Sequence, residues 1–145
     1  MNMKKLTLQI DRPCFKAILQ GKQKVEHRYI YPSNINRYVT QREFIDDNGE
    51  PSVEVECVPY DTLYLINGRR KDAPRLTVAV NSAEFVIITD EDGNNLTYTE
   101  DGEEYLVCQV WYHLGNILET EFVPESFYTD ELPEMNEHGV ALNLS

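Results

Sequence analysis

The sequence predicts a mainly β domain of the α+β class: a closed or nearly closed barrel with short helices at its ends and an inserted hairpin. Two observations support this prediction. Short apolar or alternating segments recur about every ten residues between Gly, Asn, Asp and Pro, and only two segments have helical spacing. A single chain of 145 residues is also long enough to bury roughly 70% of its unfolded surface. One domain with its own core is therefore expected.

The first two elements are a strand and a short helix. Residues 5–10 alternate between polar and apolar side chains, which predicts a half-buried strand. Asp11 is a good N-cap, Pro13 suits the first helical turn, and apolar residues three and four apart follow. These signals predict a helix over residues 12–20, ended by Gly21 in the left-handed conformation.

The next strand, residues 24–30, carries an acid and a base. Glu26 and Arg28 are two positions apart, so they share one face about 7 Å apart. His27 lies on the other face and is interpreted as a half-buried residue with satisfied hydrogen bonds rather than a catalyst. The acid and the base suit a planar polar ligand such as a nucleobase, and they equally suit a structural ion pair.

The rest of the domain is predicted to be one more short helix and a series of strands. The helix begins at Pro32-Ser33-Asn34, and Asn48-Gly49 predicts a hairpin inserted at about residues 40–58. The apolar run Thr62–Ile66 predicts a central strand. Later strands are expected, in chain order, at residues 75–80, 84–89, 96–99, 105–113 and 116–123. The domain thus covers residues 1–123, and residues 124–145 are expected to be a partly ordered acidic tail.

Charge is distributed unevenly along the chain. The net charge is −12, yet residues up to Arg75 hold all 13 Lys and Arg against 10 acids, and the remainder holds 15 acids and no Lys or Arg. Strong binding to duplex DNA is not expected, because no surface neutralises many phosphates at once. The one dense basic cluster, Arg69-Arg70-Lys71, suits either phosphate contacts or a solvated turn.

Other sequence signals exclude several classes of protein. Cys14, Cys57 and Cys108 have neither metal-knuckle nor redox spacing, so buried inert thiols are expected, with no cofactor and no metal site. No apolar run approaches the roughly 20 residues of a membrane helix, and the N-terminal residues lack a signal-peptide core. A cytoplasmic protein that does not bind membranes is therefore expected.

The pattern of strand, short helix and Gly-x-Lys-x-x-Glu-x-Arg resembles the ASCH domain family, a branch of the PUA-like β-barrels. Gly21, Glu26 and Arg28 match the motif in register, and Gln23 stands where the lysine is usual. Downstream, Asp61 is similar to the aspartate of the family's Gly-Asp turn, with a tyrosine in place of the glycine. The resemblance covers residues 4 to about 113.

The resemblance implies an RNA- or nucleotide-binding module that holds its ligand in a cleft beside the Gly21–Arg28 motif. The expected partners are single-stranded RNA, a nucleotide or a nucleoside, and an aromatic ring that stacks on a base would add roughly 1–3 kcal/mol. The candidate ligand-binding residues are Gln23, Glu26, Arg28, Tyr31, Tyr60, Arg69, Arg70 and Lys71.

Two alternative functions remain open. One bacterial subgroup of the family hydrolyses the acetyl amide of acetylated cytidine with the motif lysine and a threonine at the glutamate position. Gln23 and Glu26 replace those two groups here, so binding is favoured over catalysis and no catalytic residue is assigned. An amidohydrolase acting on a modified pyrimidine nucleoside is the first alternative. The second is a protein-interaction module that docks a basic partner through the acidic C-terminal half.

Overall fold

The computed structural model describes residues 3–132, and the chain divides into two compact units. Unit 1 consists of residues 1–26, 59–82 and 112–145, and unit 2 of residues 27–58 and 83–111. Part of the expected acidic tail, residues 133–145, lies outside the described residues. The two units are described separately below.

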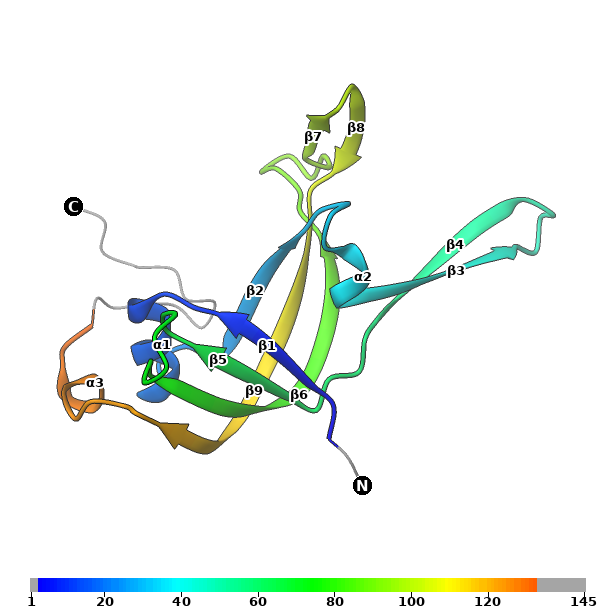
Figure 1. Cartoon of the computed structure of the whole chain (residues 1–145). Coiled ribbons are helices and arrows are strands. Elements are labelled where there is room, and N and C mark those ends of the chain that lie inside the picture. Colours follow the sequence, from blue (N-terminus) through cyan, green and yellow to red (C-terminus); the bar gives the residue numbers. More distant parts are fainter. Residues whose placement is uncertain (1–2, 133–145) are drawn as a thin grey trace. The chain divides into compact units, whose positions relative to one another are not determined.

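Strands dominate the described part of the chain, at 52% against 12% helix, which confirms the mainly β prediction. Figure 1 shows the elements in chain order: β1 (Lys5–Gln9), α1 (Arg12–Leu19), β2 (Val25–Ile30), α2 (Ile35–Tyr38), β3 (Val39–Ile45), β4 (Pro51–Cys57), β5 (Thr62–Ile66), β6 (Arg75–Ile87), β7 (Thr97–Glu100), β8 (Glu103–Leu106), β9 (Cys108–Glu121) and α3 (Ser126–Thr129). The largest sheet has the order β1-β5-β6-β9-β2, and two hairpins, β3-β4 and β7-β8, form two-stranded sheets. The described sheets are not closed into a barrel.

The core of unit 1 follows from the alternation of its strands. β1 pairs in parallel with β5, and β5 pairs antiparallel with the first half of β6. Leu6 and Leu8 are the two buried positions of β1, as the alternating pattern predicts. Leu63 and Leu65 are fully buried in β5, which confirms that the apolar run forms an interior strand.

Helix α1 begins and ends as the sequence predicts. The Asp11 side chain accepts a hydrogen bond from the Cys14 N–H, and Pro13 lies in the first turn. At the other end, Gly21 has φ +75° and its N–H donates to the Ile18 carbonyl, while the next N–H reaches back to the Ala17 carbonyl. This pair of bonds is a Schellman motif, which turns the chain from α1 toward β2.

Replacing Gly21 with alanine is expected to lower the free energy of unfolding by roughly 1–2 kcal/mol. Nothing lies within 4 Å of the new Cβ, so the cost comes from the left-handed backbone alone. Urea unfolding followed by circular dichroism measures the change. Gly21→Asn is the control and should cost less, because asparagine tolerates this conformation. Equal costs for both variants would contradict the explanation.

Two strands are longer than the sequence predicts, and the predicted breaks within them were wrong. Residues 75–80 and 84–89 were expected to be separate strands, but β6 runs through Asn81 and Ser82 without a break. Strands were likewise expected at residues 105–113 and 116–123. In the structure β8 ends at Leu106, and β9 begins at Cys108 and runs through Gly115 and Asn116 to Glu121. Polar and small residues at partly exposed strand positions satisfy their backbone within the ladder, so they do not interrupt it.

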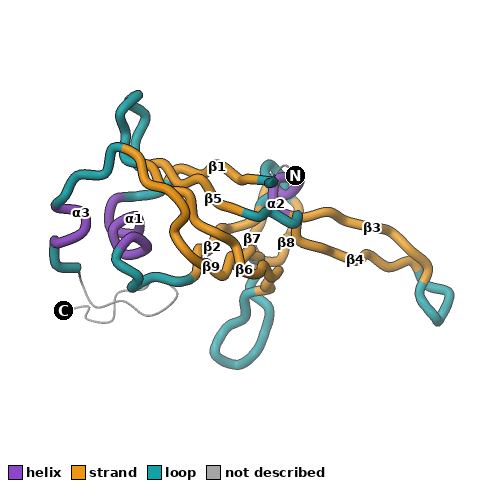
Figure 2. Tube along the Cα trace, turned by 90° about the horizontal axis from the view of Figure 1, so that it is seen from below, coloured by secondary structure: helices purple, strands orange, loops and turns teal. Residues whose placement is uncertain are grey.

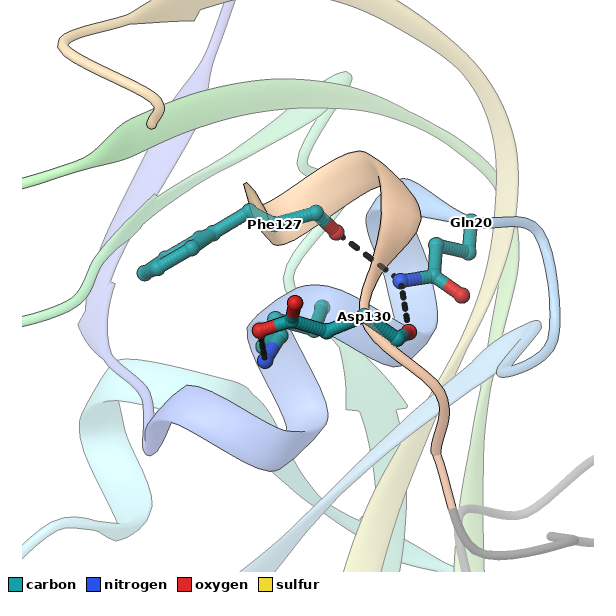
Figure 3. Close-up of polar contacts among 4 residues, drawn as sticks. Gln20, Phe127 and Asp130 are labelled. Atoms are coloured by element: carbon teal, nitrogen blue, oxygen red, sulfur yellow. Dashed lines mark hydrogen bonds and ion pairs between the residues drawn. The ribbon is translucent and has the colours of Figure 1, made fainter. Parts of the chain in front are cut away.

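Residues 126–130, within the expected tail, pack against α1 in unit 1 (Figures 2 and 3). The Phe127 ring meets the Phe15 ring edge-on at a centroid distance of 5.7 Å. The Gln20 side-chain amide donates to the carbonyls of Phe127 and Asp130 at 2.9 and 3.1 Å. Lys16 Nζ lies 2.7 Å from Asp130 Oδ2. Together these contacts fix α3 on the surface of α1.

Unit 2 contains both hairpins. β3 and β4 pair from Val39 with Cys57 to Ile45 with Pro51, around the predicted Asn48-Gly49 turn. In the second hairpin, β7 and β8 pair Tyr98 directly with Tyr105. Among the residues that the structure describes, no helix is long and apolar enough to cross a membrane.

Candidate ligand-binding pocket

Gln23 occupies the turn between α1 and β2 and is held there by the backbone on both sides. Its N–H donates to the Ala17 carbonyl at 3.1 Å, and its side-chain Nε2 donates to the Val25 carbonyl at 3.0 Å. The side chain is only 4% exposed. Its carbonyl oxygen, Oε1, is buried and has no hydrogen-bond partner among the described residues. A buried acceptor without a donor is costly, so a donor that reached this atom would be stabilising.

A pocket of about 420 Å³ in unit 1 includes Gln23 in its lining. Two apolar residues at the end of α1 and three from the strands form much of its wall, and the polar groups come from three different segments. The lining residues are Ile18, Leu19, Gly21, Gln23, Lys24, Val78, Asn81, Leu114, Gly115, Asn116 and Ile117. A mostly apolar hollow with a few convergent polar groups is typical of a small-molecule site.

Three of these lining residues, Asn81, Gly115 and Asn116, were missed by the sequence analysis. Asn81 and Gly115 were assigned to breaks between strands and Asn116 to the start of a separate strand, whereas in the structure all three lie within the neighbouring strands β6 and β9. A Cβ on Gly115 would lie 2.5 Å from Asn81 Oδ1, so glycine leaves room for that side chain. The available signal was the placement of polar or small residues inside otherwise apolar strands, which often marks a close approach to a ligand or backbone.

The other two polar motif residues do not line this pocket. Glu26 is buried, at 6% exposed, in the unit 1 part of β2. Arg28 is half-buried and belongs to unit 2. Between them, His27 is also half-buried and its ring stacks on Trp111 at 4.8 Å, in keeping with a packing role. A ligand-binding role for Glu26 and for Arg28 stays a prediction.

Tyr60 and the basic cluster lie elsewhere in unit 1. The half-buried Tyr60 ring meets Tyr112 edge-on at 6.4 Å, and the Lys4 ammonium lies 5.6 Å from its centroid. Arg69, Arg70 and Lys71 form an exposed turn after β5, where Arg70 Nε lies 3.5 Å from Asp72. None of these residues is among those that line the described pocket. Their roles in binding remain predictions.

Tyr31, by contrast, lies in a group of aromatic residues within unit 2. Its ring is 6.2 Å from Tyr29 and 5.9 Å from Tyr98, and Tyr98 stacks on Tyr105 at 5.5 Å. We refer to these four residues as the tyrosine cluster. Tyr29 and Tyr31 are 51% and 42% exposed. The sequence indicated Tyr31 alone, because only the pairing of β7 with β8 places Tyr98 and Tyr105 face to face.

Several groups of unit 2 hold their protons more tightly than usual. Burial, reinforced by Glu100, raises the pKa of Tyr98, and a hydrogen bond to Glu103 raises the pKa of Tyr105. Burial also raises the pKa of the Cys57 and Cys108 thiols. These two cysteines, and Cys14 in unit 1, are half-buried rather than fully buried as expected. At neutral pH the phenols and thiols are therefore uncharged.

No protein-family model, curated protein or solved structure matches the chain. The function is therefore argued from the two units themselves.

Proposed function

We propose that the unit 1 pocket binds a nucleobase, and that the protein is an RNA- or nucleotide-binding module of the ASCH type with a PUA-like fold. The observation that supports this most directly is the Gln23 side chain in the pocket lining, whose buried Oε1 has no donor among the described residues although its Nε2 is fixed by the bond to the Val25 carbonyl. The amine of cytosine or adenine, or the ring N–H of uracil, supplies the donor this oxygen lacks.

The pocket wall suits a flat heteroaromatic ring. Ile18, Leu114 and Ile117 contribute apolar surface that would cover the faces of a base, and Asn81 and Asn116 offer amides at the rim. This combination favours a base over a purely charged ligand, since a base buries apolar faces and pairs polar edges.

The charge of unit 1 is compatible with a phosphate. Unit 1 has 10 Lys and Arg against 11 acids, whereas unit 2 has 3 against 14. Lys24 is exposed and lies in the pocket lining, where its ammonium would meet the phosphate of a bound nucleotide. A ligand that carries phosphate is therefore expected at unit 1 rather than unit 2.

The departures from the ASCH motif favour binding without turnover. Gln23 cannot act as the basic amine of the amide-hydrolysing subgroup, and its Nε2 is already engaged by the Val25 carbonyl. Glu26 provides no hydroxyl nucleophile at the threonine position. The pocket thus has the polar groups for recognition but lacks the nucleophile pair that the family chemistry uses.

The test is to titrate the full chain with cytidine, with cytidine monophosphate and with a short single-stranded RNA. Isothermal titration calorimetry measures the affinity of each ligand. Gln23→Met keeps the length of the side chain and removes both the acceptor and the Nε2 donor to the Val25 carbonyl, so we expect roughly tenfold weaker binding of all three ligands. Lys24→Gln should weaken the two phosphate-bearing ligands and leave cytidine unchanged. Lys22→Gln is its matched control, since Lys22 is exposed and lies outside the pocket lining.

Two results would overturn the proposal. The first is the absence of measurable binding by the wild-type chain to any of the three ligands. The second is binding that Gln23→Met leaves unchanged while its unfolding curve matches that of the wild type.

A further inference from the structure

The tyrosine cluster of unit 2 borders two adjoining hollows that the proposed function does not use. One, of about 490 Å³, is lined by residues that include Tyr31, Tyr98, Tyr105, Phe85 and Glu104. The other, of about 380 Å³, includes Tyr29, Tyr31 and Tyr98. Ile30, Tyr31, Tyr98 and Cys108 contribute to both, so the two hollows adjoin at these residues, and we refer to them together as the groove.

The unit that contains this groove is strongly negative. Unit 2 has 3 Lys and Arg against 14 Asp and Glu, a net charge of −11. Of those three cations, Arg42 is paired with Glu54, and Arg37 lies 6.0 Å from the ring of Tyr38. The hairpin that carries Tyr98 and Tyr105 contributes only acids, at Glu100, Asp101, Glu103 and Glu104. Such a field attracts cations and repels phosphates.

The exposed tyrosine rings can bind a cation through a ring face. The Tyr105 hydroxyl donates to Glu103 Oε2 at 2.9 Å, which keeps electron density on the ring. Because the pKa values of Tyr98 and Tyr105 are raised, both phenols stay neutral. A guanidinium or ammonium group near an aromatic face is attracted by the quadrupole of the ring, and arginine is the commoner partner because it also stacks.

We propose that this groove docks a basic protein segment by stacking an arginine side chain on the exposed ring of Tyr31, beside Tyr98, with Glu104 accepting from the guanidinium. A planar guanidinium stacks on an aromatic face, and a carboxylate is its usual hydrogen-bond partner. A bare stretch of single-stranded RNA would also stack on these rings, but its phosphates would meet the −11 charge of unit 2. The charge therefore favours the basic peptide.

The experiment measures binding of the full chain to a fluorescent peptide of alternating glycine and arginine, by anisotropy at moderate salt. A peptide with citrulline at each arginine position is the control, because citrulline keeps the shape and loses the charge. We expect the arginine peptide to bind and the citrulline peptide to bind at least roughly tenfold more weakly.

Variants then locate the site. Tyr31→Leu removes the ring and should weaken binding roughly 3- to 30-fold, whereas Tyr31→Phe keeps the ring face and should stay near the wild type. Glu104→Gln should weaken binding as well. Tyr128→Leu is a matched control, since Tyr128 is 48% exposed and belongs to unit 1.

A measurement on the wild-type protein tests the same site without relying on variants, which could fail to fold. Cys108 lines both hollows, so the bound peptide should slow its alkylation at mildly alkaline pH, while the rate at Cys14 in unit 1 stays constant. Equal binding of the citrulline peptide, or no protection of Cys108, would overturn the proposal. So would Tyr31-dependent binding of single-stranded RNA at the same salt, which would assign the groove to nucleic acid.

Discussion

Replacing Phe15 with alanine is expected to lower the free energy of unfolding by about 3–5 kcal/mol. Phe15 is fully buried on the inner face of α1, so the change removes a large apolar side chain and leaves a cavity. The pairing with Phe127 is lost as well, because the two rings meet edge-on at 5.7 Å. Urea unfolding of both proteins at the same pH measures the difference.

A double-mutant cycle isolates the contribution of the aromatic pair. Phe127 is 5% exposed, so Phe127→Ala should also be costly, and the two changes should couple by about 0.5–1.5 kcal/mol. Phe44→Ala, at a position 38% exposed on β3, is the matched control and should cost less than about 1 kcal/mol. Strict additivity of the two changes would show that α3 does not dock on α1 as described.

Replacing Leu65 with alanine is expected to cost about 2–5 kcal/mol of unfolding free energy. Leu65 has no exposed surface, and β5 lies between β1 and β6, so the neighbouring strands restrict any collapse into the cavity. Its ladder partners are Leu8 and Leu76, both buried. The same unfolding measurement applies.

Leu118→Ala provides the matched control for Leu65→Ala, because the chemical change is identical and Leu118 is 52% exposed in β9. Its cost should stay within about 0.5 kcal/mol. Similar losses for the two leucine variants would mean that β5 is not the interior strand of the sheet.

The sequence was sufficient wherever a local signal and the tertiary structure agree. Asp11 and Gly21 bound α1 because capping depends on residues a few positions apart. The run Thr62–Ile66 forms an interior strand because an unbroken apolar segment must be covered on both faces. The Asn48-Gly49 turn fixes the register of the β3–β4 hairpin in the same local way.

Only the part of the pocket lining that comes from the sequence motif could be predicted. Gly21, Gln23 and Lys24 come from the motif, whereas Asn81 and Gly115 join them because β6 and β9 are neighbours in the sheet. That pairing depends on long-range contacts that no local pattern encodes. The same residues were interpreted as breaks because polar and small side chains are depleted in strands on average. The tyrosine cluster escaped prediction for the same reason, since it forms from separate segments of the chain.

The parallel pairing of β1 with β5 has a consequence for synthesis of the chain. Lys5 pairs with Thr62, so the first strand acquires its only neighbour among the described strands 57 residues later. At roughly 5–20 residues per second on the ribosome, that is a delay of roughly 3–11 s. During this interval Leu6 and Leu8, both buried in the finished sheet, have no strand to cover them. The nascent N-terminal segment is therefore the part of this protein for which a ribosome-associated chaperone has the longest time to act.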